Sequence, residues 1–432
     1  MAAAQNILIQ EAGTIADVAA LPGAVVALSS ARDQYQLPLA LDEAGLLHAL
    51  VTDHYWPADK KWFQQSLGHL IPRELISRRF RPGLRSTKVT VPAIALGAST
   101  LMKAAPGLDL GWLNGVSLGR KARQLAGRNE SALFCYSTCA SEAFKLGANS
   151  SPFRFLFQLH PHPKAVRSIL MEETERVPSA RSSLQMEWEL SLSGDQFCDL
   201  CSEPELANGW VVSSRFSART LCENGAPADR VHVVPYGVDT STFYNRRTRA
   251  GDRPLTALFV GSLIQRKGLS YLLDSARLLK SRNIRVVLCG RGFVDRTLLN
   301  RYSDLTLEIR QGLATSELVR VMNEADVLVL PSLAEGFGHV VLEAMACGLP
   351  VITTRNTCGP DVMTDGVHGF LVPLRDAAAI AEKLAWSLDH RDELFEMGNR
   401  AAAHAAAFTW ERFRAGVRAA YGKMVDSVRI QL

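Results

Sequence analysis

The stretch DVLVLPSLAEGFGHVVLEAMACGLPVITT, residues 326–354, shows the strand and helix patterns that decide the fold. The aliphatic runs at its two ends are typical of buried strands, and HVVLEAMA between them is typical of a helix that ends near Gly348 and Pro350. Strand, helix and strand at this spacing predict a βαβ unit in a parallel sheet. The stretch also sets Glu335 and Glu343 eight positions apart among small and apolar residues. Because carboxylates are seldom buried without a partner, these two require an explanation.

The same alternation continues on both sides of this stretch. In the second half, TALFVGSL and IRVVLCG alternate with helical patterns such as LSYLLDSARLLKSR. In the first half, the predicted strands are AVVALSS, HALVTDHY, KVTVPAIAL, SALFCYS, FRFLFQL and GWVVSS. A chain of 432 residues also exceeds the usual size of one core. We predict an α/β protein with a Rossmann-like domain at 1–235, a polar linker at 236–254, a second Rossmann-like domain at 255–408 and an amphipathic helix at 409–432.

The composition is that of a globular protein, with 47% hydrophobic and 21% charged residues. No apolar run approaches the ~20 residues that span a bilayer. The beginning of the chain, MAAAQNILIQEAG, lacks the basic and apolar segments of a secretory signal. Eight cysteines are too few for a disulfide framework at this length. We therefore expect a cytoplasmic protein.

Two cysteine pairs have a spacing that invites a metal assignment. Cys198 and Cys201 lie in CDLC, and Cys135 and Cys139 lie in CYSTC. The first pair falls on a helical pattern and the second at a strand end, where small buried side chains are common. We expect no zinc or other metal site here.

Residues 60–88 carry the most uneven charge in the chain. Eight lysines and arginines stand there against one acid, Glu74, whereas the net charge of the whole chain is +5. The stretch KKWFQQSLGHLIPRELISRRF mixes these charges with apolar residues, as an interfacial amphipathic helix does. Two interpretations stay open: the solvated face of an ordinary surface helix, which composition favours, and peripheral contact with an anionic membrane at its inner face. No recognised binding module supports a nucleic acid partner.

Three loops are predicted to meet a ligand, because ligands of open α/β sheets bind beyond the carboxyl ends of the strands. In the first, GSLIQRKG, a strand ends at Gly261, and Arg266 and Lys267 follow with charges that suit phosphate oxygens. In the second, CGRGF, Gly290 and Gly292 allow a ligand to approach the backbone. The second signal is weak alone, since the third glycine of a dinucleotide fingerprint is missing.

The third loop is the one that contains Glu335. Glycines ahead of a helix leave free N–H groups and the positive end of the helix dipole for an anion such as a diphosphate. Glu335 precedes this predicted anion site, and Glu343 follows it on the helix. Carboxylates bind hydroxyl-rich sugars well because they accept from several O–H groups. The plain alternative is that both glutamates are exposed surface charges.

These motifs resemble those of a known protein family. The run PSLAEGFGHVVLEAMACGLPVITT closely resembles the signature of the family 4 retaining glycosyltransferases, which have the GT-B fold. VHVVPYGVDTSTF is similar to the interdomain crossing, GSLIQRKGLSYLLDS to the phosphate-binding loop, and DGVHGFLVPLRD and FTWERF to C-terminal elements. The resemblance is strong from about residue 205 to 415, and before that only SSARDQYQLPLAL and FLFQLHPHP hold family-like positions. It implies two domains facing a cleft, with the C-terminal helix crossing back to the first.

The resemblance implies a retaining transfer of a sugar from a nucleotide-diphosphate sugar to an unidentified glycan, lipid or small-molecule acceptor, without a metal or a separate cofactor. Lys267 and Arg266 would hold the diphosphate, Glu343 the ribose and Glu335 the transferred sugar. His160 is placed like the active-site histidine of the family, with His162 as its rival. The other residues implied in donor binding are Gly261, Ser262, Gly290, Arg291, Gly336, Phe337, Gly338 and His339.

Two departures from the family pattern leave alternatives open. The first loop has Ala31-Arg32-Asp33-Gln34 where paired glycines are usual, and Ser262 stands where an arginine is frequent. An epimerase on the same fold and a non-catalytic nucleotide-sugar binding protein are therefore the alternative functions. A phosphorylase would need a pyridoxal-binding lysine, for which the sequence offers no candidate.

Overall fold

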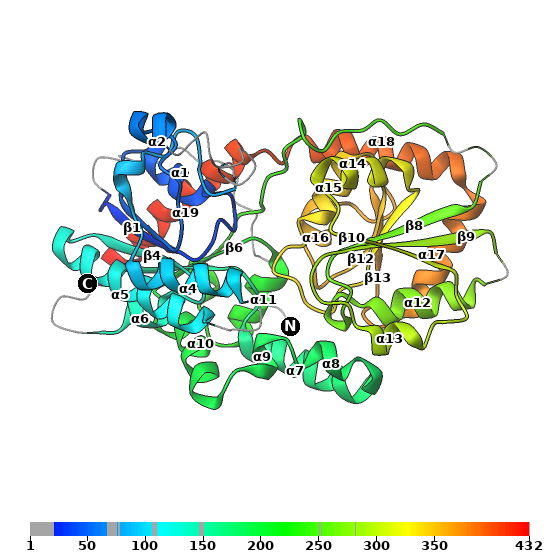
Figure 1. The fold of residues 1–432 in the computed structure, drawn as a ribbon, viewed down its shortest axis with the longest axis horizontal. Helices are drawn as coiled ribbons and strands as arrows, with labels where there is room; N and C mark the ends of the chain where they lie inside the picture. Colours follow the sequence, from blue (N-terminus) through cyan, green and yellow to red (C-terminus); the bar gives the residue numbers. More distant parts are fainter. Residues whose placement is uncertain are drawn as a thin grey trace.

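The chain folds into two parallel β-sheets that form two lobes side by side (Figure 1). The computed structural model describes residues 21–66, 76, 78–105, 110–146, 151–249, 251, 253–280 and 282–431. The first sheet has the strand order β3-β2-β1-β4-β5-β6-β7 and the second β10-β9-β8-β11-β12-β13. Every paired strand runs parallel to its neighbour. The predicted class, α/β with two Rossmann-like domains, is confirmed.

The first lobe follows the aliphatic runs of the first half. Its central strands are buried along their whole length, as expected when helices cover both faces. The strands are β1 (Ala24–Leu28), β2 (Leu47–Thr52), β3 (Val89–Thr90), β4 (Ala132–Tyr136), β5 (Arg154–Gln158), β6 (Gly209–Val212) and β7 (Val231–Val233). The helices are α1 (Gln36–Glu43), α2 (Lys61–Ser66), α4 (Ala93–Ala104), α5 (Gly111–Asn129), α6 (Ala140–Phe144), α7 (Pro163–Arg176), α8 (Arg181–Leu184), α9 (Trp188–Ser191), α10 (Gly194–Leu206) and α11 (Arg215–Glu223), with short 3₁₀ turns η3 (Ser86–Lys88), η4 (Pro178–Ala180) and η5 (Ala228–Arg230).

The second lobe contains the stretch quoted first, which forms β11, α15 and β12. The strands are β8 (Leu255–Val260), β9 (Ile284–Gly290), β10 (Leu307–Gln311), β11 (Val327–Leu330), β12 (Val351–Thr354) and β13 (Gly369–Val372). The helices are η6 (Gln265–Lys267), α12 (Leu269–Leu278), α13 (Arg296–Asn300), α14 (Thr315–Glu324), α15 (Val340–Ala346), α16 (Gly359–Val362), α17 (Ala377–Asp389) and α18 (Arg391–Ala405). Strands and crossover helices alternate regularly here, as a doubly wound sheet requires.

The last helix, α19 (Trp410–Arg429), returns to the first lobe (Figure 1). Arg414 donates to Glu43 at 3.0 Å, and the Tyr421 hydroxyl donates to the Pro22 carbonyl at 2.7 Å. The Tyr421 ring stacks on Phe134 of β4 with 6.2 Å between centroids. The predicted crossing of the C-terminal helix back to the first domain is therefore confirmed.

One predicted strand is mostly a helix. In KVTVPAIAL, only Val89 and Thr90 form a strand, and α4 starts directly after Pro92. Proline lacks an N–H and is accepted at a helix start, and the alanine-rich residues that follow favour helix. The stretch GWLNGVSLG likewise lies in α5. The described cysteines are all free, including both spaced pairs.

The basic segment 60–88 is only partly described. Residues 67–75 and 77, which hold most of its predicted amphipathic face, lie outside the described residues, as does the chain start at 1–20. Among the described charges, Arg79 pairs with Asp53 at 2.9 Å, and Lys88 pairs with Asp42 at 2.9 Å. These ion pairs compensate two of the positive charges of the segment. Membrane contact stays a prediction. No helix in the described ranges is both long and apolar enough to cross a bilayer.

A buried carboxylate on α7 ties the two lobes together. Glu173 is fully buried and accepts from Gln265 at 2.6 Å and from the Tyr271 hydroxyl at 2.9 Å. Arg375 completes the cluster at 2.8 Å. Three groups of the second lobe thus hold one carboxylate of the first, which fixes the cleft between them.

Candidate functional site

Two loops of the second lobe bring Arg266 and Lys267 to the cleft. The chain leaves β8 at Gly261 and forms the short turn η6, which ends at Gly268 with φ near 75°. A Cβ at Gly268 would lie 2.0 Å from the Pro331 carbonyl oxygen, so only glycine allows the loop to rest against the end of β11. The Arg266 carbonyl accepts from the Leu333 N–H at 2.9 Å. These contacts place both cations beside the Glu335 loop.

Glu335 is the centre of the site. Its Oε1 lies 2.6 Å from the Lys267 Nζ and 2.9 Å from an Arg266 nitrogen, and only 9% of its side chain is exposed. Burial raises the pKa of Glu335, but the charges of Lys267 and Arg266 outweigh it and hold the pKa below its ordinary value. The carboxylate is therefore ionised, with two cations on one oxygen.

The first lobe contributes His160, directly after β5. The ring lines the cleft in one cavity with Arg32 and Arg266. Desolvation, and after it the nearby charges of Arg266 and Arg32, lower the pKa of His160 to about 4. At neutral pH the imidazole is uncharged and able to hydrogen-bond a ligand. The predicted residues His160, Arg266, Lys267 and Glu335 are thus brought together.

His162 takes a different position from His160. It is buried, and its Nδ1 accepts from the Lys164 N–H at 3.2 Å at the start of α7. The backbone N–H of His162 donates to the Thr220 hydroxyl at 2.9 Å. His162 is therefore a capping residue, and the structure favours His160 as the histidine of the site.

Gly336 forms a close contact between the lobes. A Cβ there would lie 1.8 Å from the Leu159 carbonyl oxygen, so the backbones of the two lobes touch at this residue. The Gly336 carbonyl accepts from the Ser214 hydroxyl at 2.6 Å and from Ser213 and Ser217 at 3.3 Å each. The sequence predicts that Gly336 takes part in ligand binding. The contacts described here are with the opposite lobe.

The loop after β1 keeps left-handed conformations without glycine. Ser30, Gln34 and Tyr35 have φ of 59°, 53° and 60°. Such conformations are costly for residues with a Cβ and persist only where surrounding contacts hold them. Here Ser30 donates to Asp53 at 3.0 Å, and buried Asp33 accepts from the Leu37 N–H at 2.9 Å. The altered Ala31–Gln34 loop is thus a firmly held turn that points Arg32 to the cleft.

Glu343 lies on the other side of Arg32, in a second cavity of about 310 Å³. Aromatic side chains of Phe243 and Trp410 line the same cavity, with His339 between. Burial raises the pKa of Glu343 to about 7. Its carboxylate has no ion pair or side-chain hydrogen bond with the described residues, so its acceptor sites are open to a ligand.

The cavity around His160, of about 180 Å³, contains an acidic and aromatic wall that sequence reasoning missed. Glu187 pairs with Arg266 at 2.9 Å, and burial raises the pKa of Glu189. Trp188 between them is 38% exposed. These residues lie around the four-residue helix α9, which is too short to leave a periodic signal in the sequence.

The remaining predicted residues divide into two groups. Phe337 is buried, and the His339 ring stacks on Tyr236 with 4.5 Å between centroids, so both help to shape the loop before α15. Desolvation lowers the pKa of His339 to about 4. Gly290 and Arg291 lie at the same edge of the sheet but line neither cavity, and Arg291 donates to the Leu313 carbonyl at 2.7 Å. The second group also includes Gly261, Ser262 and Gly338, which line neither cavity. A Cβ at Gly261 would lie 3.7 Å from the Lys267 Cε, and one at Gly338 would lie 3.9 Å from the Glu335 Cγ.

The described residues contain no cluster of three or more histidine, cysteine or acidic side chains placed to hold a metal ion. The positive groups that the site offers to an anion are Arg32, Arg266 and Lys267.

The sequence of the second half of the chain is similar to that of known proteins. Residues 241–404 match the family model described as glycosyl transferases group 1. The D-inositol 3-phosphate glycosyltransferase of Paenarthrobacter aurescens is 32% identical over 223 residues, which are 48% of this chain and 55% of that protein. The chain spans about half the length of the curated relatives it matches.

Two solved structures share both lobes. Sucrose-phosphate synthase from Thermosynechococcus elongatus has a TM-score of 0.58 at 18% identity, covering 91% of this chain and 96% of its own. Anabaena HepE in complex with UDP-glucose has a TM-score of 0.57 at 14% identity, covering 92% and 98%. At these identities the likeness concerns the fold, and the expected GT-B fold is confirmed.

Proposed function

We propose that the chain, whose residues 241–404 match the family model of glycosyl transferases group 1, is a glycosyltransferase that uses a nucleotide-diphosphate sugar as donor. The transfer proceeds with retention of the anomeric configuration, and the acceptor is a glycan, a lipid or a small molecule bound on the first lobe. The donor is a substrate, and the reaction needs no separate cofactor. The observation that carries the proposal is the convergence of Lys267 and Arg266 on Glu335 at the cleft.

The cations support a diphosphate donor. Lys267 and Arg266 are 15% and 17% exposed, so their charges act in a partly dehydrated site where they are worth more than in water. An arginine fork and a lysine point charge together match the several oxygens of a diphosphate. In the proposed reaction they supply the countercharge as the sugar–phosphate bond breaks and the nucleoside diphosphate leaves.

The two cavities support a donor whose nucleoside lies in one cavity and whose sugar lies in the other. Glu343, Phe243 and Trp410 line one cavity, where a carboxylate and two aromatic faces suit a nucleoside. His160 lines the other, beside Glu335. Glu343 would accept from the ribose hydroxyls, while Glu335 and the neutral His160 ring would hydrogen-bond the transferred sugar.

The wall around α9 supports an acceptor with hydroxyl groups. Glu187 and Glu189 are carboxylates on the first-lobe side of the sugar cavity, and Trp188 offers an aromatic face. In the proposed reaction the acceptor hydroxyl approaches the sugar from the side on which the nucleotide leaves. Its proton passes to the departing phosphate oxygen, whose charge Lys267 and Arg266 have partly compensated.

The experiment uses the full chain with a panel of nucleotide sugars, including UDP-glucose. Transfer or slow hydrolysis of one donor releases its nucleoside diphosphate, which a coupled assay measures. NMR of the first product then reads the anomer: an α-linked donor gives an α product under retention. Release without retention would reject the retaining mechanism alone. Absence of any nucleoside diphosphate release, together with absence of a thermal shift by any donor, would contradict the proposed function.

A further inference from the structure

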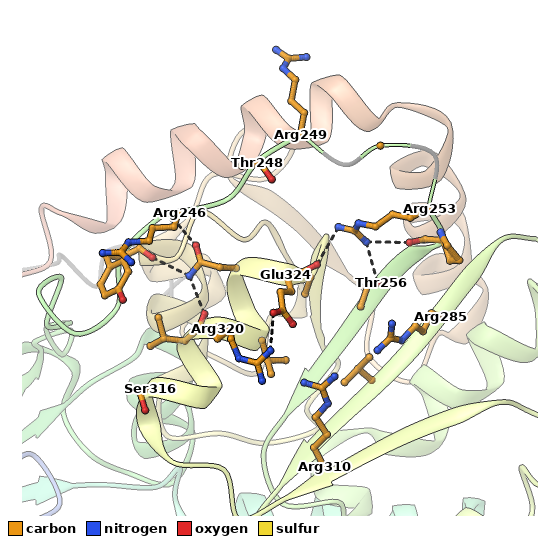
Figure 2. A pocket seen from close by; sticks show the side chains of 18 residues that line it. Arg246, Thr248, Arg249, Arg253, Thr256, Arg285, Arg310, Ser316, Arg320 and Glu324 are labelled. Atoms are coloured by element: carbon orange, nitrogen blue, oxygen red, sulfur yellow. Dashed lines mark hydrogen bonds and ion pairs between the residues drawn. The ribbon is translucent and has the colours of Figure 1, made fainter.

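A third cavity, of about 800 Å³, lies in the second lobe and shares no lining residue with the two cavities of the cleft. It is bounded by residues 244–249, 251, 253 and 254 of the linker, by α14 and by strands β8, β9 and β10 (Figure 2). Because β10 is the edge strand and side chains alternate along a strand, Thr256, Arg285, Val287 and Arg310 lie on the one sheet face that forms its floor. Its volume is in the range of small-molecule sites.

The walls of this cavity are strongly basic. Its lining holds one carboxylate, Glu324, and six arginines: Arg246, Arg249, Arg253, Arg285, Arg310 and Arg320. Two of the arginines are not available to a ligand. Arg253 is held by both oxygens of Asp326, at 2.7 and 2.9 Å, and the Arg249 side chain points away from the cavity (Figure 2).

The other four guanidinium groups have few carboxylate partners among the described residues. Arg285 and Arg310 extend from neighbouring strands and both pair with Glu308, Arg310 through its Nε at 2.6 Å. Arg320 pairs with Glu324 one turn along α14 at 2.8 Å. A guanidinium has five N–H donors, so each of these pairs leaves donors for another acceptor.

Arg246 is the fourth member. Its guanidinium lies over the Tyr244 ring, 4.6 Å from the centroid, and pairs with no carboxylate of the described residues. Four guanidinium groups therefore face two carboxylates, Glu308 and Glu324, in this part of the chain. Two positive charges are left over along the cavity wall, with Arg246 on the opposite side of the cavity from Arg285 and Arg310 (Figure 2).

We propose that this cavity is a second anion site, which binds a small molecule carrying a dianionic phosphate group. Arg285 and Arg310, which extend from neighbouring strands and share Glu308, supply the forks that match phosphate oxygens in pairs. A monocarboxylate would compensate only one of the two charges and offers fewer acceptor oxygens. The site is distinct from the cleft, where Lys267 and Arg266 hold Glu335.

The test measures binding of phosphate compounds by calorimetry in the full-length Lys267→Ala protein, in which the cleft is weakened. Inorganic phosphate, glucose 6-phosphate and UMP are titrated separately, because a free ion, a sugar phosphate and a nucleotide carry the same dianionic group. Acetate is the monoanionic comparison. Binding of at least one phosphate probe is expected, and the tightest probe identifies the source of the group.

The combined variant Arg285→Gln and Arg310→Gln in the same background is expected to lose at least tenfold in affinity for that probe. Arg249→Gln is the control, since it removes one arginine whose side chain points away from the cavity (Figure 2). Arg310→Gln alone is the second variant, because Arg285 still pairs with Glu308 when Arg310 is removed. No binding of any phosphate probe, equal binding of acetate, or equal losses in the Arg249→Gln control would overturn the proposal.

Discussion

Lys267 and Glu335 form an ion pair across two loops, with 2.6 Å between Nζ and Oε1. Arg266 meets the same oxygen at 2.9 Å, so one carboxylate holds both cations that face the cleft. Removing one partner of a buried pair leaves a charge without compensation, which is the costly change at such a site. The double pairing softens this effect, because either cation can leave while the other still compensates Glu335.

The first prediction concerns Lys267→Ala. We expect the variant to keep its fold, since Arg266 still pairs with Glu335, and to lose donor turnover. A charge-assisted hydrogen bond contributes about 1.5–3 kcal/mol, so UDP binding weakens roughly 10- to 100-fold. Calorimetry with UDP and GDP measures the loss. The control is Lys280→Ala, which removes an exposed lysine that pairs with Asp304. Unchanged nucleotide affinity in Lys267→Ala would reject the phosphate site.

The second prediction concerns Glu335→Gln and has the opposite sign for binding. The amide keeps the shape but removes the charge that competes with phosphate for Lys267 and Arg266. We expect UDP to bind about tenfold more tightly, which corresponds to about 1.4 kcal/mol, while sugar transfer falls about 100-fold. Parallel calorimetry and turnover assays separate the two effects. Weaker UDP binding with full turnover would contradict the assigned role of Glu335.

The third prediction is a pH dependence that arises from Glu343, whose pKa burial raises to about 7. Its proton must leave before it accepts hydrogen bonds from ribose hydroxyls, so donor affinity falls as pH drops through 7. Between pH 8 and 6 the ionised fraction decreases about tenfold, and affinity for UDP-glucose should follow it. UDP-glucose is the suitable probe because its diphosphate has no terminal group that titrates in this range.

Glu343→Gln tests the origin of this dependence. The variant should bind UDP-glucose more weakly at pH 8 and show a flat profile down to pH 6. The pKa values of His160 and His339, lowered to about 4, keep both rings neutral across this window. A wild-type slope that persists in Glu343→Gln would assign the titration to another group.

The sequence predicted the second lobe well for a physical reason. Its central strands are buried and its helices amphipathic, so periodicity and length agree from TALFVG to PVITT. The predictions were poorest where a proline starts a helix, as after Pro92, since the apolar run there reads equally as strand. Loop motifs gave Arg266, Lys267 and Glu335, because these residues follow strand ends that a parallel sheet brings to one edge.

The parts of the site that were missed depend on contacts between the lobes. Glu187, at the start of a helix of four residues, pairs with Arg266, and no local pattern reports an interaction over such a sequence separation. Ligand binding by Gly336 stays a prediction, and its close approach to Leu159 of the other lobe was not predicted. A glycine signals close approach, but the approaching group is set by tertiary structure.

The last prediction concerns Gly336→Ala. The added Cβ would lie 1.8 Å from the Leu159 carbonyl oxygen, a distance that neither backbone can accept, so the lobes must separate locally. We expect a destabilisation of about 1–3 kcal/mol in the interdomain contact and at least a tenfold loss in kcat/KM, since His160 moves away from Glu335. Small-angle scattering should show a larger radius of gyration, while circular dichroism stays unchanged. Gly194→Ala is the control, because its Cβ would meet no atom within 4 Å. Full activity with unchanged scattering would show that the enzyme does not need the close contact at Gly336.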